Sequence, residues 1–167
     1  MASDRVFVLD ANVFIEAARR YYAFDLVPAF WENLIRHAAN GRIKSIDRIK
    51  SELERGNDEL AEWVSGPFAH AFASTEGQDF IEAYRDVMKW VNGQSQFLPV
   101  AKAEFASGAD GWLVAYAMVK SRIVVTHEVV AADARRRVPI PNVCQMFGLP
   151  PCVDTFQTLR ELGVRFG

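Results

Sequence analysis

The sequence predicts an α/β protein in which helices cover both faces of a mainly parallel sheet, a three-layer α/β/α sandwich. Two short apolar runs, within 5–12 and 122–126, have the composition of strands that are buried on both faces. Segments with helical spacing separate the two runs, and this order of elements is typical of parallel sheets. The 167 residues, 50% of them hydrophobic, are enough for one domain over 1–167 with a substantial core.

The first predicted strand ends in an acidic residue and passes directly into a helix. Residues 5–12 read Arg-Val-Phe-Val-Leu-Asp-Ala-Asn, so Asp10 stands at the carboxyl end of the strand, where open α/β sheets bind ligands. Residues 13–20 follow without a glycine, and we expect Asn12 to be the N-cap of their helix. From this segment alone, Asp10 is either a catalytic ligand or only a cap.

The middle of the chain is predicted to be helical with one short strand. Gly41, Gly56 and Gly93 follow the apolar periodicity where helix C′ residues belong, and Asn57 is expected to cap a helix. The alternating stretch 42–46 has the pattern of a strand. The predicted helices are 26–40, 47–55, 58–65 and 77–91.

The last third of the chain contains the second apolar strand and further helices. The helices are predicted over 99–106, 110–120 and 155–162. Residues 138–143 are expected to add a strand, and Pro139 and Pro141 would confine it to an edge of the sheet.

Composition narrows the functional classes. The net charge of −2 comes from 19 basic and 21 acidic residues, so any contact with nucleic acid needs a local basic patch. No signal-peptide core and no apolar run of about 18 residues is present, so we expect a cytoplasmic protein with no membrane contact. Cys144 and Cys152 lack metal-finger spacing and are expected to be free thiols.

Four acids stand at strand ends or in the helices next to strands: Asp10, Glu52, Asp110 and Glu128. Their separations place no two on one helical face, so only the fold could bring them together. The carboxyl edge of a parallel sheet would do so. Clustered carboxylates repel one another unless protons or cations bridge them, and oxygen ligands suit Mg²⁺ or Mn²⁺. The pattern therefore predicts a divalent-metal site.

Four segments around these acids resemble the motifs of PIN-domain nucleases. The order, the spacing and the flanking apolar strands agree over essentially the whole chain. The segments are Val-Leu-Asp-Ala-Asn-Val-Phe-Ile at 8–15, Lys-Ser-Glu-Leu at 50–53, Ala-Asp-Gly-Trp-Leu-Val-Ala-Tyr-Ala at 109–117 and Ile-Val-Val-Thr-His-Glu at 123–128. Thr-His-Glu followed by Ile-Pro-Asn-Val-Cys at 140–144 is also similar to a PIN-like branch of bacterial proteins of unknown function.

This resemblance implies a PIN-like fold and a metal-dependent endoribonuclease, often the toxin of a VapC-type toxin–antitoxin pair. By matching motif, Asp10, Glu52 and Asp110 would be the catalytic metal ligands and Glu128 the fourth acid. PIN domains usually have Asp at the position of Glu128, so Asp133 is the alternative fourth acid. RNA is the implied substrate, and an antitoxin protein and a second copy of the chain are candidate partners.

The chemistry can also be argued without the family. Phosphodiester hydrolysis needs an activated water and a stabilised leaving oxygen, and two metals about 3.5 to 4 Å apart supply both. We expect in-line hydrolysis that leaves a 5′-phosphate and a 3′-hydroxyl, with no covalent intermediate. Single-stranded or looped RNA is the expected substrate because its backbone is accessible.

Polar and basic residues near the acids are candidates for substrate binding. Asn12 either orients Asp10 or only caps its helix, Thr126 is a candidate to bind a ligand or phosphate, and His127 is expected to point away. Two basic clusters either hold an RNA backbone or form solvated faces. These clusters are Arg42, Lys44, Arg48, Lys50 and Arg55, and Arg135, Arg136 and Arg137.

Two other functions compete with the nuclease. A haloacid-dehalogenase-type phosphatase would use Asp10 as a nucleophile, but it needs a second Asp where Asn12 stands and a lysine motif that the sequence lacks. A catalytically silent PIN fold that only binds RNA or protein is the second alternative. The chain keeps all the matching acids, which favours catalysis.

Overall fold

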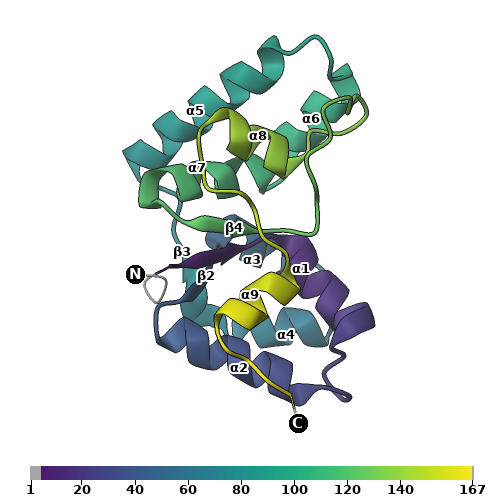
Figure 1. Ribbon diagram of the computed structural model, residues 1–167, viewed down its shortest axis with the longest axis vertical. Helices are drawn as coiled ribbons and strands as arrows, with labels where there is room; N and C mark the ends of the chain where they lie inside the picture. The colour runs from purple at the N-terminus through teal and green to yellow at the C-terminus, as the bar shows by residue number, and fades with distance from the viewer. Residues whose placement is uncertain (1–4, 167) are drawn as a thin grey trace.

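The computed structural model describes residues 5–166 as alternating strands and helices (Figure 1). The strands are β1 (Phe7–Leu9), β2 (Ile43–Ile46), β3 (Phe72–Ala73) and β4 (Ile123–Val125). The α-helices are α1 (Ala11–Glu16), α2 (Pro28–Ala39), α3 (Asp47–Glu54), α4 (Glu59–Ser65), α5 (Gln78–Gly93), α6 (Pro99–Ser107), α7 (Asp110–Lys120), α8 (Ile140–Met146) and α9 (Thr155–Glu161). The π-helix η2 (Ala17–Tyr21) continues α1, and the short 3₁₀-helix η3 (Ala69–Ala71) precedes β3.

The four described strands form one parallel sheet in the order β3-β2-β1-β4. Phe7 pairs with Ile43 of β2 and with Ile123 of β4, so β1 is central and hydrogen-bonds on both sides. All three residues of β1 are buried because helices cover both faces of the sheet. The predicted α/β fold with a mainly parallel central sheet is confirmed.

Helices lie on both faces of the sheet and form the outer layers of the sandwich (Figure 1). The helices α5, α6, α7 and α8 lie on one side, where α5 packs against α7. On the other side lie α1, α2, α4 and α9, above a core rich in aromatic rings. In that core Phe14, Trp63 and Phe68 contact one another, and their apolar area drives these helices onto the sheet.

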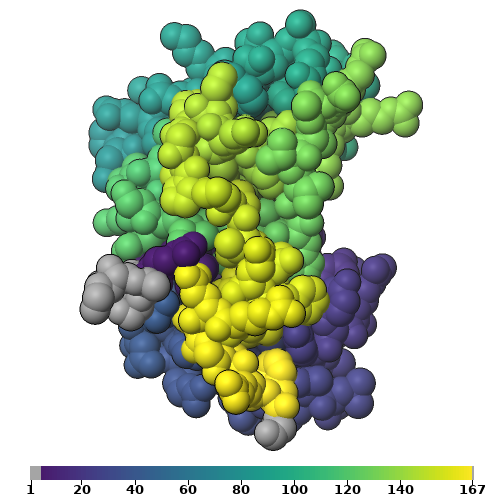
Figure 2. Space-filling model, in the orientation of Figure 1, coloured from purple at the N-terminus to yellow at the C-terminus, as the bar shows by residue number. Residues whose placement is uncertain are grey.

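All strands point toward one edge of the sheet because they are parallel, and this edge is the right-hand side of Figure 1. The segments that follow β1 and β4 leave the sheet there. Figure 2 shows a notch at the same edge, between the surface of the upper layer and that of the lower layer. The topology thus gathers the strand-end residues at a hollowed edge.

The expected strand over 138–143 is wrong, because these residues lead into helix α8. Pro139 is the N-cap of this helix and Pro141 lies in its first turn. Proline fits the first turn of a helix, where its missing N–H has no partner to lose and its fixed φ is already helical. The two prolines that suggested an edge strand therefore mark a helix start.

Two predicted caps are displaced by one or two residues. Asp10, not Asn12, occupies the N-cap of α1, and Asp58, not Asn57, caps α4 by accepting a hydrogen bond from the Ala61 amide. Asn57 instead has a φ of +49° in the turn before the cap. The expected C′ role of Gly41 is confirmed by its φ of +75°.

Three further findings bear on the sequence analysis. Strand β3 has only two residues, and no alternation in the sequence predicted it. Both cysteines of the chain are free. Among the residues described, no helix is long and apolar enough to cross a membrane.

Candidate active site

Asp10 is held at the centre of the sheet edge, between β1 and α1. Its backbone N–H donates to Val125 of β4, at 3.0 Å, and its Oδ2 accepts from the Thr126 hydroxyl, at 2.9 Å. Within residues 5–166 the side chain makes no capping hydrogen bond to α1, although Asp10 occupies the N-cap position. Asp10 thus occupies the N-cap position without a capping hydrogen bond, and its side chain is held by Thr126 instead.

Burial makes the charge of Asp10 costly. The residue is 2% exposed, and its pKa is raised from 3.8 to about 6. Burial is the largest cause and the nearby charge of Glu128 is the second, while the hydrogen bond from Thr126 lowers the pKa. A cation close to this carboxylate would remove most of the cost.

Asp110 is the first residue of α7 and faces the same edge. Its pKa is raised from 3.8 to about 7, first by burial and then by the charges of Asp10, Glu128 and Glu52. Arg137 opposes this rise. The fold therefore brings the four predicted acids into one electrostatic cluster around Asp110, although the sequence separates them widely.

Glu52 connects α3 to the start of α7. Its Oε1 accepts a hydrogen bond of 2.9 Å from the backbone N–H of Ala109, the N-cap residue of α7. This contact uses one oxygen of the carboxylate and fixes the position of the helix that carries Asp110. Glu52 thus has a positioning role that is visible without any ligand.

Glu128 makes two protein contacts. Its Oε1 accepts from the backbone N–H of Ile140 at 2.9 Å, and its Oε2 accepts from Nη2 of Arg137 at 2.7 Å. The ion pair holds the guanidinium of Arg137 beside Asp110. In this conformation both oxygens of Glu128 have protein partners, so its first role is to anchor the segment between β4 and α8.

The donor set fits a hard divalent cation. Asp10 and Asp110 supply carboxylate oxygens, and the pKa of each is raised first by burial and then by the charges of neighbouring acids. Across the described part of the chain, no group of three or more acidic, histidine or cysteine side chains is arranged to hold a metal ion. Mg²⁺ commonly binds through one or two carboxylates together with water and substrate phosphates, so two acids meet its requirement.

Thr126 and Asn12 lie at the site in different ways. Thr126 is 2% exposed, and its hydroxyl donates to Asp10 and accepts from the backbone N–H of Glu128 at 3.2 Å. It is therefore placed to orient an acid rather than to face a substrate. Asn12 lies in the first turn of α1, half-buried, and its side chain has no hydrogen-bond partner among the residues described.

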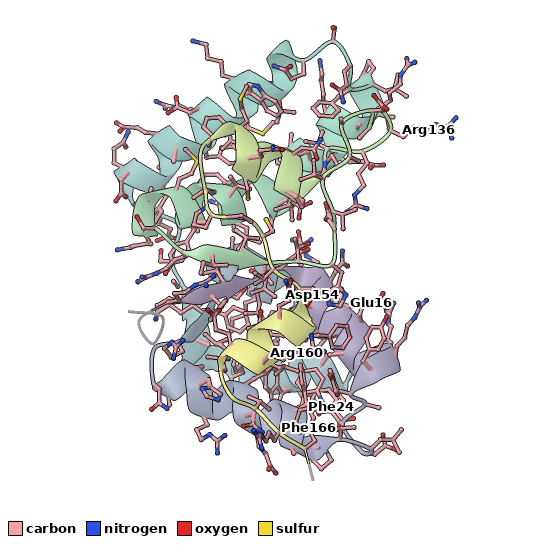
Figure 3. All side chains as sticks on the ribbon, viewed as in Figure 1. Glu16, Phe24, Arg136, Asp154, Arg160 and Phe166 are labelled. Atoms are coloured by element: carbon pink, nitrogen blue, oxygen red, sulfur yellow. The ribbon has the colours of Figure 1, made fainter. Side chains whose placement is uncertain are left out.

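The three consecutive arginines separate in space. Arg137 lies at the site, with its side chain 58% exposed. Arg136 projects into solvent from the outer end of its loop (Figure 3). Arg135 lines a different hollow together with Asp133, so Asp133 does not replace Glu128 in the acid cluster. Only Arg137 of the three is in contact with the acids.

The basic cluster around Glu52 also divides. Arg48 lies 3.7 Å above the ring of Trp112, next to the start of α7, and its Nε donates to Thr75. Lys50 pairs with Glu54 on the outer face of α3. Arg42 precedes β2 and so lies at the opposite edge of the sheet.

One acid near the site was missed by the sequence analysis. Glu104 of α6 lines a cavity of about 120 Å³ together with Phe105, Asp110 and Arg137. Glu104 lies in the middle of a helix and away from any strand end, so the position at a strand end or in a helix next to a strand that marks the other acids does not mark Glu104. Its position opposite Asp110 depends on the packing of α6 against α7.

A family model described as a domain of unknown function (DUF4411) matches residues 7–166. A comparison with curated proteins finds no match. Among solved structures, the chain is similar to VapBC2 from Rickettsia felis bound to a DNA fragment from its promoter, with 13% identity and a TM-score of 0.49. That similarity covers 89% of this chain and 96% of the other chain.

Proposed function

The chain belongs to the DUF4411 family, and from its acid cluster we propose that it is a divalent-metal-dependent endoribonuclease. One observation carries this proposal: Asp10 and Asp110 lie at the same sheet edge, with pKa values raised to about 6 and about 7. Among the described residues, Arg137 is the one cation whose charge opposes the rise for Asp110, whereas the charges of three acids add to it. Such an excess of buried negative charge is suited to binding a metal.

Asp10 and Asp110 would hold the cation, which when bound lowers the pKa of water and neutralises charge on a leaving oxygen. Thr126 orients Asp10 through its hydroxyl, and Glu52 holds the start of α7 in place. Arg137 would bind a phosphate oxygen beside Asp110. Glu128 holds one side of its guanidinium, and the side chain remains 58% exposed and open to a ligand. These roles correspond to hydrolysis of a phosphodiester at the edge of the sheet where the strands end.

RNA as the substrate is inferred from the sequence motifs, which resemble those of PIN-domain ribonucleases. The test is incubation with end-labelled single-stranded RNA in Mn²⁺ or in EDTA. We expect cleavage in Mn²⁺ that leaves a 5′-phosphate, no cleavage in EDTA, and none by Asp110→Asn. Asp79→Asn is the matched control, since Asp79 also lies in the first turn of a helix but is exposed and remote from the acids.

Binding of the RNA without cleavage in any metal would instead support a catalytically silent binding module. Cleavage that persists in EDTA or in Asp110→Asn would contradict the assignment of the acids.

We further propose that the nuclease is the toxin of a toxin–antitoxin pair, as the motif resemblance implies. A groove of about 320 Å³ beside Glu128 is lined by apolar residues, and Val129 and Val130 on its rim are 74% and 53% exposed. An antitoxin segment seated there would cover this apolar surface and block access to the acids. Expression with and without the product of a neighbouring small open reading frame tests this: growth arrest that the second product relieves supports it, and unimpaired growth with the chain alone opposes it. Size-exclusion chromatography with light scattering tests the homodimer.

A further inference from the structure

Three aromatic side chains gather on the surface next to the acid cluster: Tyr21, His127 and Phe156. The rings of His127 and Phe156 are nearly parallel, with 16° between their planes and 6.4 Å between their centroids. Tyr21 stands edge-on to both, at 6.2 Å from His127 and 5.7 Å from Phe156. Tyr21 is 49% exposed and Phe156 is 37% exposed, so part of each ring faces solvent.

These rings come from three separate elements that the fold holds together. Tyr21 is the last residue of the π-helix η2, and π-helical turns occur frequently at functional sites. His127 follows β4, and its Nε2 hydrogen-bonds to the hydroxyl of Thr155 at 2.6 Å, at the start of α9. Phe156 is the next residue of α9. The aromatic cluster is thus fixed before any ligand binds.

Its position links it to the acids. His127 lies between Thr126, which hydrogen-bonds to Asp10, and Glu128, which pairs with Arg137. Figure 1 shows α1 and α9 side by side on the same face of the sheet, at the edge where β1 and β4 end. A ligand at the acids would therefore lie at the same edge of the sheet as the aromatic cluster.

We propose that Tyr21, His127 and Phe156 form a stacking site for a nucleobase of single-stranded RNA whose phosphate lies at the acids. This inference rests on the proposed ribonuclease function. Bases stack on exposed aromatic rings whatever their sequence, and unpaired RNA offers splayed bases to such rings. Arg19 is exposed on η2 next to Tyr21 and adds positive charge for the adjoining backbone, whereas Arg20, also exposed, pairs with Glu16 at 3.4 Å.

A nucleobase explains these features better than a protein partner does. The exposed rings occupy a small area, they adjoin the acids within one residue of the chain, and the exposed Arg19 stands two residues before Tyr21. A protein surface would favour a larger continuous apolar patch. The rings also lie apart from the apolar groove that Val129 and Val130 border, whose lining includes none of the three.

The test measures binding of a labelled 12-nucleotide single-stranded RNA to Asp110→Asn protein, which keeps the RNA intact. Adding Tyr21→Ala or Phe156→Ala should weaken this binding about tenfold each, the effect of losing one base–aromatic contact. Tyr21→Phe should leave the affinity within about twofold. Phe166→Ala is the control, because Phe166 is a similarly exposed phenylalanine, 42%, that packs on Tyr22 instead.

A scan with a single abasic nucleotide adds a result that misfolding cannot imitate. At one position of the RNA, removing the base should weaken binding to the protein that retains both rings. The same removal should not weaken binding to Phe156→Ala any further, because that variant has already lost the base–ring contact. Unfolding curves confirm that each variant is folded.

Unchanged RNA affinity in both ring variants would overturn the proposal and leave the rings as a surface for a protein partner. If the abasic effect is found but Mn²⁺ supports no cleavage by the unsubstituted chain, the stacking site holds and the nuclease proposal fails. If the chain binds no RNA at all, both fail.

Discussion

Replacing Asp110 by Asn should stabilise the metal-free protein at pH 7.5, although it should abolish cleavage. The rise of its pKa from 3.8 to about 7 means that the folded state disfavours the ionised carboxylate by about 4 kcal/mol at high pH. Part of this cost is repulsion between the charges of Asp110 and Asp10. We therefore expect Asn at position 110, which cannot ionise, to recover about 2 kcal/mol of unfolding free energy. For a chain of this length that corresponds to a rise in Tm of roughly 4–8 °C.

The pH dependence follows from the direction of the shift. A carboxyl group whose pKa is higher in the folded state keeps its proton longer there than in the unfolded chain, so stability falls as pH rises from about 4 to about 7. The advantage of Asp110→Asn should therefore be largest at pH 7.5, fall to less than about half of that value at pH 5, and vanish only below about pH 4. Thermal unfolding in EDTA at both values measures it.

Metal and a control variant complete the test. Mn²⁺ at pH 7.5 should raise the Tm of the unsubstituted protein and leave that of Asp110→Asn nearly unchanged, because ligand binding to the folded state adds to stability. Asp79→Asn should give no gain, since an exposed acid in the first turn of a helix is favourable. A gain for Asp110→Asn that is equal at pH 5 and 7.5, or no gain at either, would refute the reasoning.

Three further predictions concern the surroundings of the acids. Thr126→Val removes a buried hydroxyl that contacts Asp10 and the Glu128 amide. It should cost about 1–3 kcal/mol of unfolding free energy and much of the cleavage rate. Thr126→Ser keeps the hydroxyl and should preserve both the stability and the rate. Arg137→Gln removes the charge that lowers the pKa of Asp110, so the pH–rate profile should move to higher pH, whereas Arg136→Gln should leave it in place; equal profiles for the two variants would argue against the role of Arg137. Gly111→Ala would place its Cβ 3.0 Å from Tyr84 and 3.1 Å from Phe105, so urea unfolding should show a loss of about 1–3 kcal/mol. Gly93→Ala, with nothing within 4 Å, should show no such loss.

The sequence predicted the gathering of the acids because one rule governs it. Parallel strands end at a common edge, so Asp10 and the residues after β4 had to meet there. What each carboxylate contacts depends on packing that no local pattern encodes. Glu128 meets Arg137 because the segment between them folds back toward Ile140, and Glu52 meets the Ala109 amide because α3 crosses the start of α7.

The aromatic cluster shows the same limit of sequence reasoning. Tyr21, His127 and Phe156 lie far apart in the chain, and none belongs to a periodic pattern that would single it out. Only the packing of α9 against the end of η2 brings Tyr21 and Phe156 together. Pro139 and Pro141 illustrate an ambiguity of another kind, since proline suits both an edge strand and the first turn of a helix.

The central claim is that Asp10 and Asp110 together bind a divalent cation. A crystal of the protein soaked in Mn²⁺, with anomalous data collected near the manganese edge, tests this most directly. We predict an anomalous peak at roughly 2.1 Å from oxygen atoms of both carboxylates, the distance expected for a small hard cation. An acid cluster with no peak, in which the side chain of Arg137 or another protein cation lies between the two carboxylates, would contradict the claim.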